Sequence, residues 1–272
     1  SPDALLIRLV TADAFAVTLW RGFLSAVVVL IWLMMAERGA IWSKFRIIGK
    51  VGWFSSLLYP VTALLFILAI KNTAVANVLV IVGAEPLCAA LLAALIFKEK
   101  VSKRMWVLGI FIVIGLAIVF WGSLSRDTWF GDLMAVGAML GVALRYVIFR
   151  ATRQIDMAPT VVIGGLLTVL VLTPFADPFA VSQRDLGLLI IMGMVLLPVA
   201  QMMLVAAPRY IPAPEIALIV LLEAILAPFW VWLALGEVPP RETVLGGVLI
   251  IGALVAHFVP YLISVRRRHD TH

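Results

Sequence analysis

The sequence predicts an all-α polytopic membrane protein, with ten transmembrane helices arranged as two inverted five-helix repeats around a central cavity. Composition is the first indication, because 64% of the residues are hydrophobic and only 13% are charged, against about 25% charged in soluble domains. The second is internal similarity, since a shift of 138 residues aligns rare polar positions within long apolar stretches. Together these observations predict a bundle of membrane helices built from a duplicated unit.

Nine stretches are long and apolar enough to cross a bilayer core about 30 Å thick, which needs about 20 residues per helix. Their approximate bounds are 13–36, 49–70, 73–97, 104–121, 131–150, 159–175, 186–206, 214–235 and 243–265. Residues 1–10 are apolar but too short to span, and we interpret them as the tail of a truncated first helix. A re-entrant or interfacial segment is the alternative.

The internal similarity divides the chain into two units. The offset pairs Tyr59-Pro60-Val61 with Leu197-Pro198-Val199, Glu85 with Glu223, Glu99 with Glu237, and Gly109 with Gly247. We assign 1–121 to a first five-helix repeat with an incomplete first helix, 122–130 to a connecting loop, 131–265 to a second repeat, and 266–272 to a basic cytoplasmic tail. An odd number of spans inverts the second repeat, an architecture that secondary transporters use for alternating access.

Lys and Arg are distributed unevenly between alternate loops. One side carries fourteen, and the other carries five, which are Arg8, Lys71, Arg126, Arg184 and Arg241. Because positively charged loops remain in the cytoplasm, the first side and both chain termini are predicted to be cytoplasmic. The predicted location is the bacterial inner (plasma) membrane. We interpret the basic tail as an anchor near anionic lipid rather than as a nucleic-acid site.

Prolines inside predicted spans mark candidate kinks. Pro60, Pro86, Pro198 and Pro228 each remove a backbone donor, and the freed carbonyl group needs a partner or a cavity. Pro60 and Pro198 align across the repeat, so we interpret the four as hinge or kink candidates, with rigid packing kinks as the alternative. The pattern Gly137-x-x-x-Gly141 is typical of a helix-packing seam, and a monomer is favoured over a homodimer.

Ionisable side chains near the middle of a span cost about 2.5 to 3.5 kcal/mol on insertion scales and therefore need compensation. Glu85 and Glu223 lie mid-span at aligned positions. They are candidates for contact with a substrate ammonium group or for protonation, and a structural or conformational role is the alternative. Arg145 is a candidate for binding a substrate carboxylate or for neutralising Glu85. Arg21 lies about a third of the way along its helix from the outer end and could extend outward to the interface, so a structural role is favoured for it.

The remaining cavity candidates are large polar or aromatic side chains within spans: Tyr59, Gln201, Tyr146, Trp53 and Asn77. An apolar wall with a few fixed polar groups suits a small zwitterion with an apolar side chain. If Lys71 and Arg209 also lined the cavity, a phosphate-bearing substrate would be favoured, but both lie at span ends. Glu99 and Glu237 are interpreted as helix caps or local ion-pair partners.

No enzymatic chemistry is predicted. The sequence has no Gly-x-x-x-x-Gly-Lys-Ser/Thr loop for ATP, no His-Glu-x-x-His motif and no Gly-x-Ser-x-Gly motif. The single Cys88 lies mid-span and two of the three His residues lie in the tail, so no metal site is expected. We expect no catalytic residue, no cofactor, no metal and no nucleic-acid partner.

The acidic motifs and the glycine-bearing helices that follow them resemble the EamA-type drug/metabolite transporters. The residues that carry this resemblance are Ala84-Glu85-Pro86-Leu87, Phe97-Lys98-Glu99-Lys100, Leu222-Glu223-Ala224, Leu235-Gly236-Glu237-Val238 and Gly246-Gly247. The first copy has Lys98 where the family usually has Gly, and the second has Ala224 where it usually has Pro. The resemblance covers nearly the whole chain and implies ten helices around a central cavity, with the fifth and tenth at one edge.

Bacterial members of this family include exporters of amino acids, such as those of the YddG type, so the resemblance implies a secondary exporter of amino acids or related small metabolites that works by alternating access. An exchanger of phosphorylated metabolites or nucleotide-sugars, and a drug or cation efflux carrier, are the alternatives. A passive channel is a third possibility, which the internal prolines and the repeat disfavour. The expected partners are a small-molecule substrate and the lipid bilayer.

Overall fold

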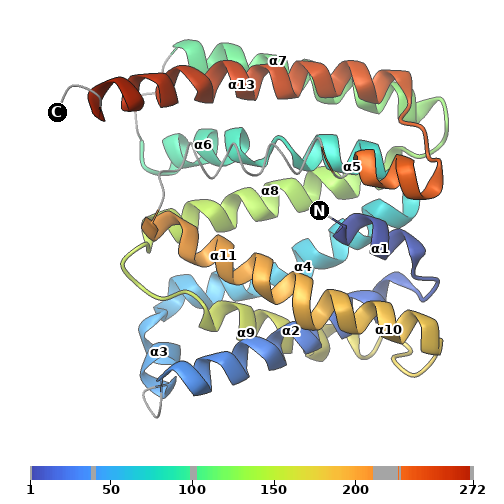
Figure 1. Cartoon of the computed structure of the whole chain (residues 1–272), viewed down its shortest axis with the longest axis vertical. Coiled ribbons are helices and arrows are strands. Elements are labelled where there is room, and N and C mark those ends of the chain that lie inside the picture. Colours follow the sequence, from blue (N-terminus) through green and yellow to red (C-terminus); the bar gives the residue numbers. More distant parts are fainter. Residues whose placement is uncertain (1, 38–40, 99–102, 211–225, 227, 270–272) are drawn as a thin grey trace.

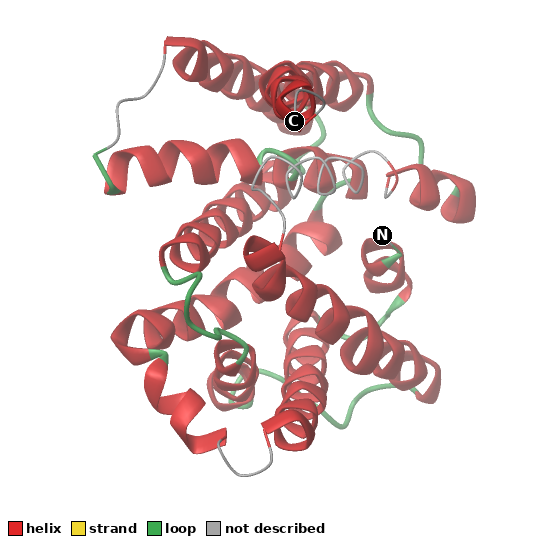
Figure 2. Ribbon diagram, turned by 60° about the vertical axis from the view of Figure 1, so that its left-hand side comes forward, coloured by secondary structure: helices red, strands yellow, loops and turns green. Residues whose placement is uncertain are grey.

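In the computed structural model, the described residues are 2–37, 41–98, 103–210, 226 and 228–269, and within them the chain forms helices and loops only (Figures 1 and 2). The helices are α1 (Asp3–Leu9), α2 (Ala14–Glu37), α3 (Ile41–Ile47), α4 (Gly49–Asn72), α5 (Val75–Val82), α6 (Glu85–Ile96), α7 (Lys103–Leu124), α8 (Trp129–Ala151), α9 (Pro159–Leu172), α10 (Gln183–Ile191), the π-helix η1 (Met192–Leu196), α11 (Leu197–Tyr210) and α13 (Arg241–His269). Residues 228–235 are also helical.

The predicted spans correspond closely to these helices. By length and composition, six stretches of the described chain are able to cross a membrane: Ala14–Ala36, Gly49–Asn72, Val75–Ile96, Trp106–Leu124, Trp129–Ala151 and Gln183–Ala207. Helix α9 is a shorter apolar helix, and α13 runs through the predicted last span. Most of the predicted span 214–235, with Glu223, lies outside the described residues. The count of ten helices therefore stays a prediction.

The predicted span 73–97 consists of two helices, because the chain turns at Gly83–Ala84 between α5 and α6. Pro86 lies in the first turn of α6, where its missing N–H costs nothing. Gly83 closes α5 by donating its N–H to the carbonyl of Leu79. The break therefore places Glu85 at a helix N-terminus, where the helix dipole favours a negative charge.

The predicted span 186–206 is interrupted by a π-helical turn. The turn η1 lies between α10 and α11, and the Leu197 N–H donates to the carbonyl of Met192 five residues earlier. Pro198 follows at once and has no N–H to donate, so the wider turn lies next to the missing hydrogen bond. Such π-turns inside α-helices are frequent at functional sites. Helix α4, by contrast, continues through Pro60.

Helices that the 138-residue offset aligns lie against each other at two edges of the bundle. Helix α7 packs along α13, and α2 packs along α9 (Figure 1). Both contacts depend on glycine, since a Cβ on Gly246 would lie 2.5 Å from the Gly115 carbonyl oxygen. A Cβ on Gly165 would likewise overlap the Gly22 carbonyl oxygen. Small residues permit this backbone approach.

Helix α8 uses the predicted Gly-x-x-x-Gly seam within the chain. A Cβ on Gly137 would meet the Leu65 side chain of α4 at 3.0 Å, and one on Gly141 would overlap Thr62 of α4. The seam therefore joins α8 to α4, the helix that carries Pro60 and Tyr59.

A buried polar cluster fastens one end of the bundle. Asp132 of α8 accepts hydrogen bonds from the hydroxyl groups of Thr73 (2.7 Å) and Ser123, and from the Asn77 amide at 3.2 Å. Thr243 of α13 donates to the Asn77 amide oxygen. These five side chains are at most 3% exposed. The cluster ties α5, α7, α8 and α13 together.

The close contact of α7 and α13 gives a stability prediction with a control on the same helix. Gly246→Ala forces a methyl group onto the Gly115 carbonyl, so we expect a loss of about 1 to 3 kcal/mol, as for other overpacked sites, and a lower melting temperature in detergent. Gly252→Ala on the same helix meets nothing within 4 Å and should leave the melting temperature unchanged or slightly raised. Equal melting temperatures for the two variants would contradict the packing argument.

Candidate functional site

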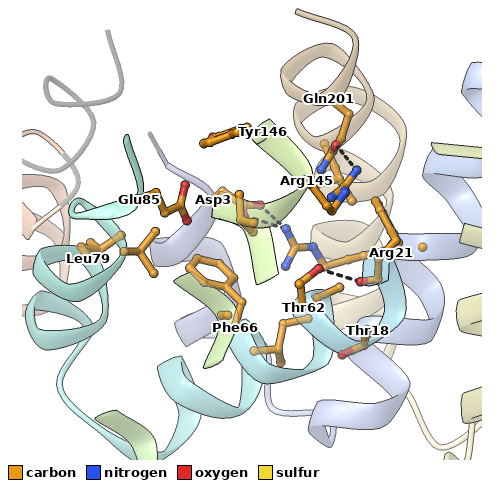
Figure 3. Close-up of a pocket in the computed structure, with 18 of the residues that line it drawn as sticks. Asp3, Thr18, Arg21, Thr62, Phe66, Leu79, Glu85, Arg145, Tyr146 and Gln201 are labelled. Atoms are coloured by element: carbon orange, nitrogen blue, oxygen red, sulfur yellow. Dashed lines mark hydrogen bonds and ion pairs between the residues drawn. The ribbon is translucent and has the colours of Figure 1, made fainter. Parts of the chain in front are cut away.

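A cavity of about 220 Å³ lies in the middle of the bundle, and helices from both predicted repeats line it. Its walls come from α1, α2, α4, α5, α6, α8 and α11 (Figure 3). Most of the lining is apolar. The side chains with polar or charged groups are Asp3, Thr18, Arg21, Tyr59, Thr62, Glu85, Arg145, Tyr146 and Gln201.

Arg21 of α2 and Asp3 of α1 form an ion pair in the cavity wall. The Arg21 Nη2 atom lies 2.6 Å from Asp3 Oδ2 and 2.8 Å from Oδ1. Arg21 is only 5% exposed. Arg21 therefore does not extend outward to the interface, because a carboxylate inside the bundle compensates its charge, and its contact with Asp3 fits the structural role that the sequence favoured.

Arg145 of α8 lies between two aromatic rings. Its guanidinium carbon is 5.0 Å from the centre of the Tyr59 ring and 5.5 Å from the centre of the Phe149 ring. Both distances are within the range of cation–π attraction. Its hydrogen bond to the Gln201 side-chain oxygen is long, at 3.5 Å. Arg145 is 3% exposed, and its buried Nε atom has no hydrogen-bond partner among the described residues.

Glu85 lines the cavity from the start of α6 and is 6% exposed. Figure 3 draws its carboxylate on the opposite side of the Asp3–Arg21 pair from Arg145. Tyr146, the residue after Arg145, lines the same space. The cavity thus contains two formal negative charges, on Asp3 and Glu85, and two formal positive charges, on Arg21 and Arg145.

The structure brings together most of the residues that the sequence predicted to line a cavity. Glu85, Tyr59, Gln201, Tyr146 and Arg145 all line the cavity. Their roles in binding stay predictions. The prolines flank some of them, since Pro60 follows Tyr59, Pro86 follows Glu85, and Pro198 follows Leu197, which is also in the lining. Pro228 lies in the described helical segment 228–235, outside the lining.

Two nominated residues lie elsewhere. Trp53 is 51% exposed, on a face of α4 that also presents Leu57 and Val61 outward, a face suited to lipid. Asn77 is buried in the polar cluster around Asp132. Glu223 falls outside the described residues. Among the described residues, no group of three or more His, Cys, Asp or Glu side chains is placed to hold a metal ion.

Sequence reasoning missed Asp3 and underestimated Arg21 as cavity residues. Asp3 lies in the segment interpreted as the tail of a truncated helix, so its charge was not weighed against Arg21. The signal was present, since an acidic and a basic residue in neighbouring apolar segments are costly unless they meet. Thr18 and Thr62 carry no such signal, because hydroxyl groups are common in membrane helices and often donate to their own backbone.

Polar contacts also join the two predicted repeats at the end of the bundle expected to face outward. Arg8 lies 3.5 Å from the Glu237 carboxylate, which also accepts the Val75 N–H at 3.0 Å. Glu237 thus caps α5, as the sequence suggested in general terms, but from the other repeat. Asp185 accepts the backbone N–H groups of Thr11 and Ala12 at 3.1 and 3.0 Å.

Lys71 lies at this same end and not in the cavity. Its ammonium group donates to the carbonyl oxygens of Val10 and Ala12. The condition under which a phosphate-bearing substrate would have been favoured, a cavity lined by Lys71 as well, is therefore not met.

The sequence of this chain is similar to those of known proteins. A model of the EamA-like transporter family matches residues 4–121 and 129–258. The pseudopaline exporter CntI of Pseudomonas aeruginosa (strain UCBPP-PA14) is 27% identical over 253 residues, which cover 90% of this chain and 86% of the relative. The uncharacterized transporter YyaM of Bacillus subtilis (strain 168) is 30% identical over 186 residues, 62% of this chain and 58% of the relative.

A solved crystal structure with 14% sequence identity superposes with a TM-score of 0.62 and covers 93% of each chain. At that identity the likeness shows the fold alone. The family model, by contrast, matches most of the chain in two successive segments, and the apolar helices in the structure are of the length that a membrane requires. The chain therefore belongs to the EamA-like transporter family, within the drug/metabolite transporter superfamily, and is a multi-pass membrane transporter.

Proposed function

We propose that the protein is a secondary transporter that exports an amino acid or a related small metabolite across the bacterial inner membrane by alternating access. The observation that carries the proposal is the charge balance of the cavity. Two carboxylates and two guanidinium groups line a space that is otherwise mainly apolar and aromatic. Such a space suits a zwitterion with an apolar side chain, because each charged end of the substrate finds an opposite charge.

The same balance argues against the alternative substrates. Recognition of phosphate by proteins draws on clusters of cationic side chains, and Arg21 is already engaged by Asp3 while Lys71 lies at the end of the bundle. A purely cationic drug would find Glu85 but would also meet the positive charge of Arg145 in the same cavity, which a zwitterion can neutralise with its carboxylate. The relative CntI, named as a pseudopaline exporter, supports export as the direction.

Two features support alternating access. The cavity is lined by helices from both predicted repeats, so relative movement of the repeats would change its shape and access. At the predicted outer end, Asp185 accepts a hydrogen bond from Thr11 and Glu237 accepts one from Val75, so polar contacts join the two repeats there. We infer that these contacts close that end in the present state and open when the cavity faces outward.

The substrate prediction is tested by counterflow in proteoliposomes loaded with unlabelled amino acids, nucleotide-sugars, sugar phosphates or organic cations. We expect accumulation of labelled apolar or aromatic amino acids. Exchange of sugar phosphates alone, without any amino acid, would make the proposed substrate class wrong.

Glu85 should be required for this counterflow. Glu85→Gln keeps the shape of the side chain but removes its charge, and a hydrogen bond to a charged group contributes about 1.5 to 3 kcal/mol, so we expect a loss in apparent affinity of about tenfold or more. Glu223→Gln tests the aligned residue. Glu242→Gln, which alters an exposed ion pair with Arg126, is the matched control and should transport normally. Wild-type affinity in Glu85→Gln would remove this carboxylate from substrate binding.

The outer-end contacts give a test of alternating access. Cysteines are introduced at Thr11 and Asp185 in a Cys88→Ala background and joined by a short thiol-specific cross-linker. We expect the cross-link to block transport, because it prevents the predicted outer end of the bundle from opening. A cleavable linker should restore transport when it is cut. Each single-cysteine variant, treated in the same way, controls for modification alone. Undiminished transport by the fully cross-linked protein would contradict a gate at this end.

A further inference from the structure

We propose that Arg145 is the residue that binds the carboxylate group of the substrate. The inference rests on the proposed function and deepens it. It restricts the substrate to a molecule with a free carboxylate, and it names the side chain that binds this carboxylate. Three observations support this proposal. Arg145 has few hydrogen-bond partners among the described residues, two aromatic rings hold its guanidinium group in place, and Arg21 in the same cavity already pairs with Asp3.

The missing partner is the first feature. Arg145 is 3% exposed, yet among the described residues its only hydrogen bond is the 3.5 Å contact with Gln201. Its buried Nε atom has no partner there. A guanidinium group carries five N–H donors, and burying a charged group without compensation is costly. The buried Nε atom of Arg21 also lacks a partner, but its Nη2 atom donates to both oxygens of Asp3, whereas Arg145 has no such ion pair among the described residues.

The fixed plane is the second feature. The rings of Tyr59 and Phe149 lie 5.0 and 5.5 Å from the guanidinium carbon. Aromatic contacts of this kind attract the cation without using its N–H donors. The side chain is therefore held in place while its hydrogen-bonding capacity is retained for a ligand. A planar guanidinium group with available donors matches the two oxygens of a carboxylate.

The third feature is that, among the described lining residues, Arg145 is the cation without an ion-pair partner. Arg21 binds both oxygens of Asp3, so a substrate would have to break that pair to use it. Gln201, by contrast, holds Arg145 only weakly, because a hydrogen bond at 3.5 Å is near the limit of the interaction. A substrate carboxylate could replace Gln201 at little cost.

One guanidinium group selects a carboxylate over a phosphate. A carboxylate has one negative charge and two coplanar oxygens, which one planar guanidinium group matches. A phosphate monoester carries about two negative charges and three acceptor oxygens, and would leave part of its charge uncompensated here. The chemistry at Arg145 thus distinguishes between the two leading substrate classes.

The test compares substrates that differ only at the carboxylate. Each amino acid that supports counterflow is used as a competitor beside its carboxamide, which has the same side chain and ammonium group but no negative charge. Because hydrogen bonds to charged groups are worth about 1.5 to 3 kcal/mol, the wild-type protein should prefer the acid by about 10- to 100-fold. Equal competition by acid and amide would overturn the proposal.

The variants assign the preference to Arg145. In the Arg145→Gln variant, the acid and the amide should have similar apparent affinities. Arg145→Lys should retain part of the preference, because lysine keeps the positive charge but lacks the paired N–H donors of a guanidinium group. Arg126→Gln is the matched control, since this arginine is 44% exposed and pairs with Glu242 outside the cavity; it should keep the full preference. A full preference in folded Arg145→Gln would overturn the assignment.

A binding measurement separates failure of this inference from failure of the proposed function. If no amino acid is transported, purified protein in detergent is heated with each acid and each amide. A ligand that binds the folded state raises the melting temperature. Stabilisation by acids but not amides, lost in Arg145→Gln, would support the carboxylate site although the proposed transport is wrong. Failure of every acid to stabilise the wild-type protein would overturn the inference as well. If Arg145→Gln does not fold, the wild-type comparison of acid with amide decides alone.

Discussion

The architecture depends on one constraint, which is that charge and unpaired backbone groups are costly in hydrocarbon. Most of the bundle meets this constraint with uninterrupted helices and apolar side chains. Apart from the polar cluster around Asp132, several exceptions lie around the cavity, where the chain breaks before Glu85, widens into a π-turn before Pro198, and buries Arg21 and Arg145. Irregular backbone at membrane depth is tolerated where it lines a cavity or is buried in protein. The cavity is thus where the chain can hold polar groups for a ligand.

The two buried arginines show how the same residue type can serve different ends. Arg21 has a carboxylate against it and behaves as part of the wall, joining α1 to α2. Arg145 has aromatic faces against it, and among the described residues its one hydrogen bond is the long contact with Gln201. The difference lies in the neighbours, because ring faces stabilise a cation without consuming N–H groups. On the proposal made above, this arginine is already in place before the substrate carboxylate binds.

The positions of the helices could be predicted because span length and hydropathy are imposed by the bilayer. Pro86 and Pro198 marked both interruptions as candidate kinks, but the sequence did not predict their form, which is a separation into two helices at Gly83–Ala84 and a π-turn at Met192–Leu196. Tyr59, Gln201 and Arg145 were found because polar groups in spans are rare. Trp53 and Asn77 share that property yet lie outside the cavity lining. Sequence gives the depth of a residue in the membrane but not the direction in which its helix turns it, to lipid, cavity or neighbour.

The buried polar cluster around Asp132 has a consequence for how the protein is made. Thr243 donates a hydrogen bond to Asn77 of α5, which lies 166 residues earlier in the chain. Glu237 accepts the N–H of Val75 at the start of α5, which lies 162 residues before Glu237. Helix α5 therefore enters the bilayer during synthesis well before the side chains that complete its polar contacts leave the ribosome. Until then, part of its hydrogen-bonding capacity must be met by lipid headgroups, water or the insertion machinery. The polar contacts of α5 are thus completed only when Glu237 and Thr243 have been made.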